Sequence, residues 1–219
     1  MMAVDLKLVE EIVRQVLAEK AAQKPAGKEP PAIPVGISAR HVHLSRKDMD
    51  TLFGKDAALT PMKTLMGGQF AAKEQVTIIG PSLRPIEKVR VLGPLRSQTQ
   101  VEISRTDTFV LKVKPPVRPS GEIAGSAGIT LIGPKGAVKL DEGCILANRH
   151  IHMSPADALR YGVTDGELAD VLAEGERRTL LYDVQIRVHP EYTLEMHVDT
   201  DDANAIGFQG KAEAILLKR

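Results

Sequence analysis

The sequence predicts a mainly β fold. From residue 35 onward the chain is dominated by short runs rich in β-branched and aliphatic residues, among them EQVTIIG, KVRVLG, TQVEIS, TFVLKV and TLEMHV. Gly and Pro turn signals, as in TIIGPS and LIGPKG, separate most of these runs. Only one long helical pattern occurs in the sequence. Many short strands at this spacing are typical of barrels or sandwiches rather than of a doubly wound α/β sheet.

The composition excludes several classes of protein. The 219 residues suffice for one large domain or two small ones. A net charge of +1 and an aromatic content of 3% provide neither a basic field nor stacking platforms, so nucleic acid is not an expected partner. Cys144 is the only cysteine, which excludes a four-Cys zinc site. No apolar run approaches the roughly 18 residues of a membrane span, so a membrane is not expected either.

The N-terminal region combines a helical pattern with a linker. Within residues 1–20, apolar residues from Leu6 to Leu17 recur at spacings of three and four, which predicts an amphipathic helix. Residues 21–34 contain four prolines and predict an extended linker. The helix either docks back on its own domain or frays, or it packs into a groove of another protein.

Two short helices are predicted inside the β-rich region, over residues 45–53 and 154–160. Each begins with a serine that suits an N-cap, and Pro155 stands where a first helical turn tolerates proline.

The chain contains a loose internal repeat. SARHVHLS at residues 38–45 is echoed by ANRHIHMS at 147–154, so both copies contain two histidines separated by one aliphatic residue. A second echo relates residues 89–104 to 184–199. Aligning Pro94 with Pro190, with one deletion, places Glu102 opposite His197.

The repeated histidines predict two metal sites. Alternate residues of a strand point to one face, so both imidazoles of a pair can converge on a cation with a third ligand from a neighbouring strand. Three protein ligands with an open fourth position are typical of catalytic zinc. The competing interpretation is that the histidines satisfy buried hydrogen bonds. The predicted ligands are His41, His43 and Glu102 in the first half and His150, His152 and His197 in the second.

Arginines near these motifs are candidates for binding an oxyanion. Arg40 and Arg149 precede the histidine pairs, whereas Arg84 and Arg96 follow Gly-Pro turns. A guanidinium suits phosphate or carboxylate, although each arginine taken singly could form an ordinary surface salt bridge. Arg96 is the best candidate because it lies on the turn that leads to Glu102.

Two further residues receive structural interpretations. Cys144 lies in the apolar run GCILA, which indicates core packing rather than a nucleophile. His189 precedes Pro190 and is interpreted as a turn or surface residue.

The segments SARHVHLS, GPLRSQTQVEIS, SGEIAGSAGITLIGPKGAVKL and ANRHIHMSPADA resemble the PduL-type phosphate propanoyltransferases (phosphotransacylases) of bacterial microcompartments. The resemblance runs from about residue 35 to the C-terminus. It implies interconversion of an acyl-CoA and phosphate with an acyl phosphate and CoA, on two β-barrels capped by short helices. It also implies one zinc ion on each predicted ligand set and phosphate at Arg96. The implied coenzyme A contacts are Ile37, Ser38 and Ala39, with Arg84 and Asn204 as further candidates.

The resemblance also implies a domain organisation and a location. Residues 40–147 would form one barrel, and residues 35–39 with 148–219 the other. The helix and linker would direct the enzyme to shell or core proteins in the lumen of a microcompartment, within the cytoplasm. We further expect a homo-oligomer. Propanoyl-CoA and acetyl-CoA remain equally open as substrates, because no residue can be assigned to the acyl pocket.

The expected mechanism is direct transfer in a ternary complex without a covalent acyl-enzyme, because phosphorolysis of a thioester requires no nucleophilic side chain. A cupin oxygenase also uses paired histidines on strands. It needs a Glu three or four residues beyond the second histidine, and neither copy of the repeat has one. A zinc-dependent thioester hydrolase and a non-catalytic microcompartment scaffold remain the alternatives.

Overall fold

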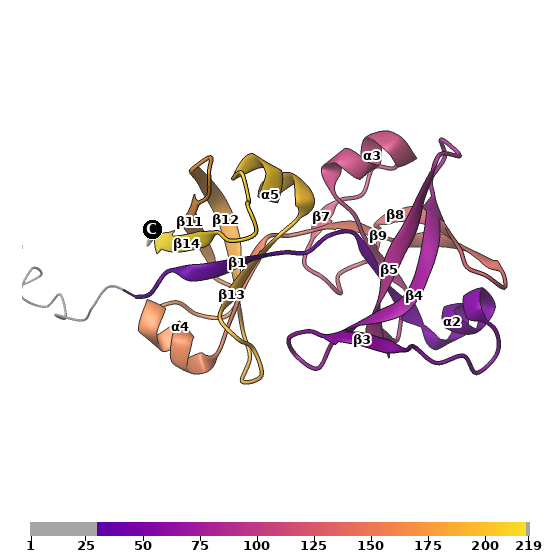
Figure 1. Cartoon of the computed structure of the whole chain (residues 1–219), viewed down its shortest axis with the longest axis horizontal. Helices are drawn as coiled ribbons and strands as arrows, with labels where there is room; N and C mark the ends of the chain where they lie inside the picture. The colour runs from indigo at the N-terminus through magenta and orange to yellow at the C-terminus, as the bar shows by residue number, and fades with distance from the viewer. Residues whose placement is uncertain (1–29, 218–219) are drawn as a thin grey trace, which may run out of the picture. The chain divides into compact units, whose positions relative to one another are not determined.

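The computed structural model describes residues 30–217 and shows a mostly β fold of two six-stranded barrels with four short helices (Figure 1). The predicted helix over residues 1–20 and most of the predicted linker lie outside the described residues. Among the residues described, no helix has the length and apolar character needed to cross a membrane.

The first barrel closes because β8 pairs with both β4 and β9, which completes the ring β4-β5-β2-β6-β9-β8. Two short strands, β3 and β7, extend it by pairing with β4 and β9. Its eight strands are β2 (His41–Ser45), β3 (Pro61–Thr64), β4 (Phe70–Ile79), β5 (Pro85–Arg96), β6 (Gln100–Glu102), β7 (Val117–Arg118), β8 (Ala127–Ile132) and β9 (Ala137–Ala147).

The second barrel has the order β1-β13-β10-β12-β11-β14 and includes the first described strand of the chain. In Figure 1 the indigo strand β1 lies beside the yellow strand β14, and the two pair antiparallel. The six strands are β1 (Ile33–Ile37), β10 (His150–Met153), β11 (Leu168–Glu174), β12 (Thr179–Val188), β13 (Glu195–Val198) and β14 (Glu213–Leu217). The linker was predicted to run to residue 34, but Ile33 and Pro34 belong to β1. The side chain of Ile33 is fully buried in this barrel.

The two predicted short helices are confirmed. α2 (Arg46–Phe53) begins after Ser45, whose hydroxyl accepts a hydrogen bond from the backbone N–H of Asp48. α4 (Pro155–Tyr161) begins after Ser154 in the same way, with Pro155 in its first turn. These caps satisfy amide groups that a helix start leaves without partners.

Two further helices follow β6 and β13, and one of them corrects a sequence prediction. TFVLKV was expected to be a strand, but residues 108–111 belong to α3 (Arg105–Leu111). A capping box formed by Ser104 and Asp107 starts this helix, and Thr108 and Leu111 are buried at helical spacing. Their local β propensity is therefore overridden by the cap and by packing. The corresponding helix in the second half is α5 (Thr200–Ala205).

Each barrel has its own apolar core. Cys144 is fully buried in the first core, and its thiol is free, which confirms its predicted packing role. His189 lies just after β12 and is exposed, as predicted.

Candidate metal and anion site

The first predicted ligand set is assembled by β2 and β6. His41 and His43 alternate with Val42 on β2, and the antiparallel register places Glu102 directly opposite His41. The Nε2 atom of His41 lies 3.4 Å from Oε2 of Glu102, and Nε2 of His43 lies 3.9 Å from Oε1. All three residues are buried. The potential ligand atoms lie within 4.8 Å of one another, which suits a single cation.

The second set is assembled by β10 and β13 in the same register. His150 lies opposite His197, and His152 follows on the same face of β10. The ring centroids of His152 and His197 are 4.8 Å apart, and those of His150 and His152 are 4.5 Å apart. Their potential ligand atoms also lie within 4.8 Å of one another. The repeat in the sequence therefore corresponds to a repeat in strand pairing.

The imidazole contacts fit metal coordination. Nδ1 of His41 contacts the Ala39 carbonyl oxygen at 2.9 Å, and Nδ1 of His150 contacts the Asn148 carbonyl oxygen at 2.8 Å. Such a contact fixes the ring and leaves Nε2 with the lone pair. The Nδ1 atoms of His43 and His152 are the only buried side-chain polar atoms of residues 30–217 without a hydrogen-bond partner. Coordination to an ion would resolve the cost of such unpartnered groups, so both sets fit a zinc-type cation.

Electrostatics favour the metal-binding protonation states of Glu102, His43 and His150. Burial alone would lower the pKa of His41, but the Glu102 carboxylate outweighs burial and raises it. Burial alone would raise the pKa of Glu102, but the charge of His41 and its hydrogen bond outweigh burial and hold that pKa well below the usual range. Burial lowers the pKa of His43 to about 3, with added repulsion from His41 and Arg96. Burial likewise lowers the pKa of His150 to about 4. A carboxylate and neutral imidazoles are the forms that bind metal.

Arg96 lies beside the first set, as the sequence analysis expected. Its guanidinium donates to Oγ of Ser120 at 3.2 Å, and the Ser120 hydroxyl donates to Oε1 of Glu102 at 2.8 Å. Burial lowers the pKa of Arg96, the Glu102 carboxylate opposes that shift, and the positive charge of Arg187 adds to it. No salt bridge of Arg96 to a carboxylate is found among the described residues, so its charge is available to an anion.

Arg187 was missed by the sequence analysis. It stands on β12 next to His152 in the parallel register, whereas the equivalent neighbour of His43 on β5 is Leu92. Its charge contributes to lowering the pKa values of His150, His152 and Arg96. Two guanidinium groups, one from each barrel, therefore act on the same region. Because the first half has Leu92 at this position, the repeat offered no signal for Arg187.

Arg40 and Arg149 are engaged elsewhere. Arg40 pairs with Asp107 at 2.8 Å, and Arg149 pairs with Asp202 at 3.2 Å. Each acceptor lies in the first turn of a helix, α3 or α5. These two arginines hold the helices against the histidine-bearing segments, which is the salt-bridge interpretation of the sequence.

The predicted coenzyme A contacts occupy different places. Ile37 ends β1, and Ser38 and Ala39 lie in the crossing to β2, where the Ser38 amide donates to the Val198 carbonyl oxygen and the Ala39 carbonyl contacts His41. Arg84 is exposed in the turn between β4 and β5, where its backbone N–H donates to the Ser82 hydroxyl at 3.2 Å. Asn204 is exposed near the end of α5. The structure thus brings Ala39 into contact with the first ligand set, whereas no contact of Arg84 or Asn204 with either set is found among the described residues.

Tyr192 is a second residue that the sequence analysis missed. Its ring lies 4.2 Å, between centroids, from the ring of His152. A Cβ atom added to Gly67 would lie 3.2 Å from this tyrosine ring, so the loop between β3 and β4 closes over it. Tyr192 therefore covers one side of the second histidine set, and Gly67 of the first barrel lies next to it.

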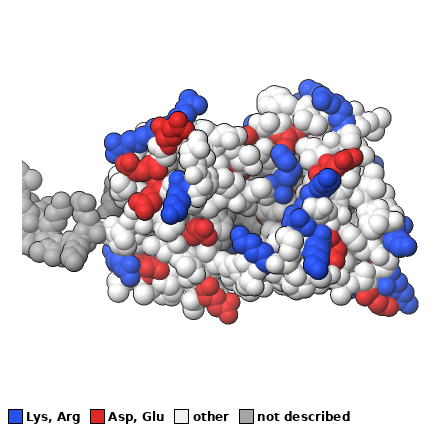
Figure 2. Space-filling view, viewed as in Figure 1, with Lys and Arg blue, Asp and Glu red and all other residues white. Residues whose placement is uncertain are grey.

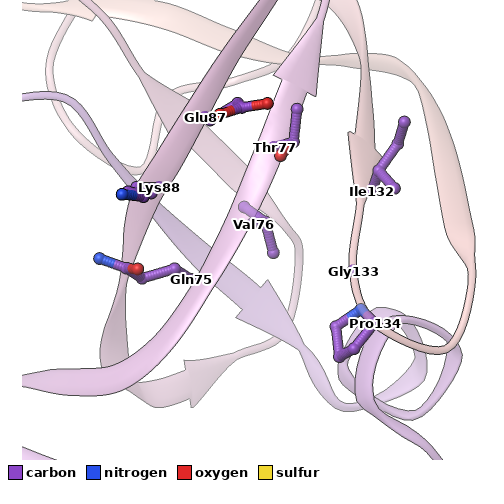
Figure 3. Close-up of a pocket in the computed structure, with 8 residues that line it drawn as sticks. All are labelled: Gln75, Val76, Thr77, Glu87, Lys88, Ile132, Gly133 and Pro134. Atoms are coloured by element: carbon purple, nitrogen blue, oxygen red, sulfur yellow. The ribbon is translucent and has the colours of Figure 1, made fainter.

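Outside the two ligand sets, the surface has mixed charge on the face shown in Figure 2 and an open pocket on the first barrel. In Figure 2, Lys and Arg are interspersed with Asp and Glu over the face shown, and no single-sign field covers it. An open pocket lies on β4, β5 and the turn after β8, and Figure 3 shows that residues such as Gln75, Thr77 and Lys88 line it. None of its lining residues is a predicted site residue.

Comparison with known proteins identifies the family of this chain. The sequence model of the phosphate propanoyltransferase family matches residues 34–209. A phosphate propanoyltransferase of Lachnoclostridium phytofermentans is 56% identical over 200 residues, which cover 91% of this chain and 92% of the relative. One from Thermotoga maritima is 57% identical over 179 residues, covering 81% and 85%, and one from Listeria monocytogenes is 42% identical over 212 residues, covering 97% and 94%.

These similarities extend over both barrels and over both ligand sets. The chain is therefore an enzyme of the transferase class. It belongs to the phosphate propanoyltransferase family, as the resemblance of its histidine motifs indicated.

Proposed function

We propose that the chain catalyses the reversible transfer of an acyl group between coenzyme A and phosphate, with propanoyl-CoA or acetyl-CoA as the acyl donor. The observation that carries this proposal is the chain of contacts from Arg96 through Ser120 to Glu102. It places an anion-binding guanidinium directly beside a ligand set suited to a cation. Phosphate and the thioester can then meet at one place.

We propose that His41, His43 and Glu102 hold one zinc ion and that His150, His152 and His197 hold a second. When bound, zinc supplies Lewis acidity for the thioester carbonyl and affinity for the sulfur of coenzyme A. The unpartnered Nδ1 atoms of His43 and His152 support this assignment.

The chain's own residues perform the positioning. Arg96 binds phosphate through its planar fork, with Ser120 fixing one of its N–H groups. Arg187 approaches the same region from the second barrel and adds a second positive charge for the dianion. Placing phosphate in this way converts a bimolecular encounter into an oriented attack.

We propose direct transfer without an acyl-enzyme. A phosphate oxygen forms the new bond to the acyl carbon, the bond from that carbon to sulfur breaks, and coenzyme A leaves as the thiolate. In the reverse direction the thiolate attacks the acyl phosphate. Cys144 has no nucleophilic role in this proposal, because its side chain is fully buried in the first core and burial raises the pKa of its thiol to about 12.

Coenzyme A is proposed to lie along Ile37, Ser38 and Ala39, with Arg84 and Asn204 as outer contacts. The proximity of Ala39 to His41 supports this placement, since it brings the crossing segment next to the first ligand set. Arg84 and Asn204 are exposed, which suits contacts to the outer parts of a long substrate.

We further propose that the predicted helix and linker direct the enzyme into a bacterial microcompartment, where shell or core proteins are its partners, and that the enzyme is a homo-oligomer. A variant lacking residues 1–29 keeps every described strand, including all of β1. It should retain turnover and lose co-sedimentation with microcompartments. Retained co-sedimentation would place the targeting signal elsewhere.

The decisive experiment follows phosphate-dependent release of the coenzyme A thiol from propanoyl-CoA and acetyl-CoA, before and after chelation. Release that requires phosphate, disappears on chelation and returns with zinc supports the proposed reaction. Release without phosphate would indicate a thioester hydrolase. No release from a protein that still holds metal would favour the scaffold alternative.

A further inference from the structure

The two ligand sets share a contact that the histidine motifs do not reveal. In the first half, His41 lies opposite Glu102 and His43 lies opposite Gln100. In the second half, His150 lies opposite His197 and His152 lies opposite Glu195. Gln100 and Glu195 therefore occupy equivalent positions, each two residues before the third member of its ligand set and on the same face of the strand.

Each of these two residues hydrogen-bonds the third member of its own set. Nε2 of Gln100 donates to Oε1 of Glu102 at 2.6 Å. Oε2 of Glu195 lies 3.0 Å from Nε2 of His197, which donates to it. The pairing is chemically matched: the carboxylate receives an amide donor, and the imidazole receives a carboxylate acceptor.

We propose that Gln100 and Glu195 are positioning residues that orient Glu102 and His197 toward their cations. The inference rests on the proposed metal function. The bond from His197 to Glu195 fixes the proton on Nε2 and leaves the lone pair of Nδ1 for coordination. The bond from Gln100 occupies one oxygen of Glu102 and fixes the rotation of its carboxylate.

Packing supports both assignments. Gln100 is 1% exposed, and its Oε1 atom accepts a hydrogen bond from the Gly121 amide at 2.8 Å, so its amide group has one orientation. Glu195 lies against Gly36 of β1, where an added Cβ atom would be 2.5 Å from Oε1 of the glutamate. The absence of a side chain at residue 36 leaves the space that this carboxylate occupies.

The test measures metal affinity at each set by competition with a chromophoric chelator, using Zn²⁺ and Co²⁺, on the full chain. Glu195→Ala should lower the affinity for one of the two bound ions by about 10–100-fold and leave the affinity for the other unchanged. Gln100→Ala should lower the affinity for the other ion instead. Glu195→Gln keeps a carbonyl oxygen as hydrogen-bond acceptor, so its metal affinity should fall much less than that of Glu195→Ala.

Matched controls are Glu191→Ala, which removes an exposed carboxylate from the segment that precedes β13, and Gln98→Ala, which removes an exposed amide near Gln100. Both should bind two ions as the unmodified protein does. Gly36→Ala provides an independent perturbation, since it displaces the Glu195 carboxylate without removing it. It should lower the affinity for the same ion that Glu195→Ala affects, and it should change the visible absorption of bound Co²⁺.

The outcomes separate this inference from the proposed function. If the unmodified protein binds neither ion, the metal sites and this inference both fail. If it binds two ions and Glu195→Ala and Gln100→Ala bind them equally tightly, only the inference is overturned. If Glu195→Gln loses as much affinity as Glu195→Ala, the carboxylate acts as a ligand itself and the positioning role is wrong.

Discussion

Arg40 and Asp107 form a two-point ion pair that joins the approach to β2 with the start of α3. Nε of Arg40 donates to Oδ2 of Asp107 at 2.9 Å, and a terminal nitrogen lies 2.8 Å from Oδ1. The same carboxylate accepts from the Ser104 amide and so completes the capping box of the helix. The residue that precedes the first histidine pair is thus tied to the helix that follows Glu102.

Arg40→Ala should destabilise the protein by about 1–3 kcal/mol, because the Asp107 side chain is only 4% exposed and would lose its charged partner. The measurement is the shift in the urea midpoint. Arg46→Ala is the matched control, because it removes an exposed pair with Asp50 within one helix and should change stability by less than about 0.5 kcal/mol. Equal shifts for both variants would contradict the prediction.

Arg96→Gln should lower kcat/KM for phosphate by roughly 10²–10³-fold, since it removes a preorganised positive charge. Arg96→Lys should recover only part of this loss, because an ammonium cannot present a planar fork. Steady-state kinetics with varied phosphate measure both. Arg160→Gln, an exposed arginine on α4, should leave the rate unchanged. Normal phosphate dependence in Arg96→Gln would refute its role.

Arg187→Gln should raise KM for phosphate by about tenfold or more, the loss expected for one charge-assisted hydrogen bond. KM for the acyl-CoA should stay nearly constant. In the double variant with Arg96→Gln, the fold-loss in kcat/KM for phosphate should be smaller than the product of the two single fold-losses, because both groups act on one anion. Arg178→Gln, whose side chain is 63% exposed, serves as the control.

Ser120→Ala tests the proposed absence of an acyl-enzyme. The Ser120 hydroxyl donates to Glu102, an arrangement that could also activate a nucleophile. Direct transfer predicts that kcat/KM for phosphate falls by about tenfold or less, because Arg96 is positioned less firmly. It also predicts no label on the protein after rapid quenching with labelled acyl-CoA. Label recovered on the peptide containing Ser120 would show covalent catalysis.

Cys144 should resist iodoacetamide at pH 8 in the folded protein and react after unfolding. Burial raises its pKa to about 12 from an ordinary value of 9.0, so folding favours the neutral thiol. This stabilisation is complete below pH 9 and is lost as the pH rises through 12. The difference in unfolding free energy between Cys144→Ala and the unmodified protein should therefore change only above pH 9. A difference that changes below pH 8 would contradict this account.

The sequence predicted the parts of the site that obey strand periodicity and duplication. His41, His43 and Glu102 follow from alternation on β2 and from the second copy, and the structure brings them together. Ser120 could not be found in this way, because it lies outside the strands and reaches Glu102 only through the fold. Arg187 could not be found either, since Leu92 is its equivalent in the other half.

Helices were harder to predict than strands for a related reason. α2 and α4 have serine caps that stand out in the sequence. α3 also follows a serine cap, Ser104, but residues such as Phe109 and Val110 suit a strand equally well. The capping box and the burial of Thr108 and Leu111 together decide for a helix.

The position of β1 determines the order in which the protein can be completed during synthesis. The ribosome releases β1 before the first barrel, but the strands that flank it, β13 and β14, emerge last. The first barrel can therefore close while Ile33, which ends fully buried, still lacks both neighbouring strands. A translational stop just before Glu213 would leave one finished barrel beside an unpaired sheet edge, the kind of nascent chain that chaperones must shield from aggregation.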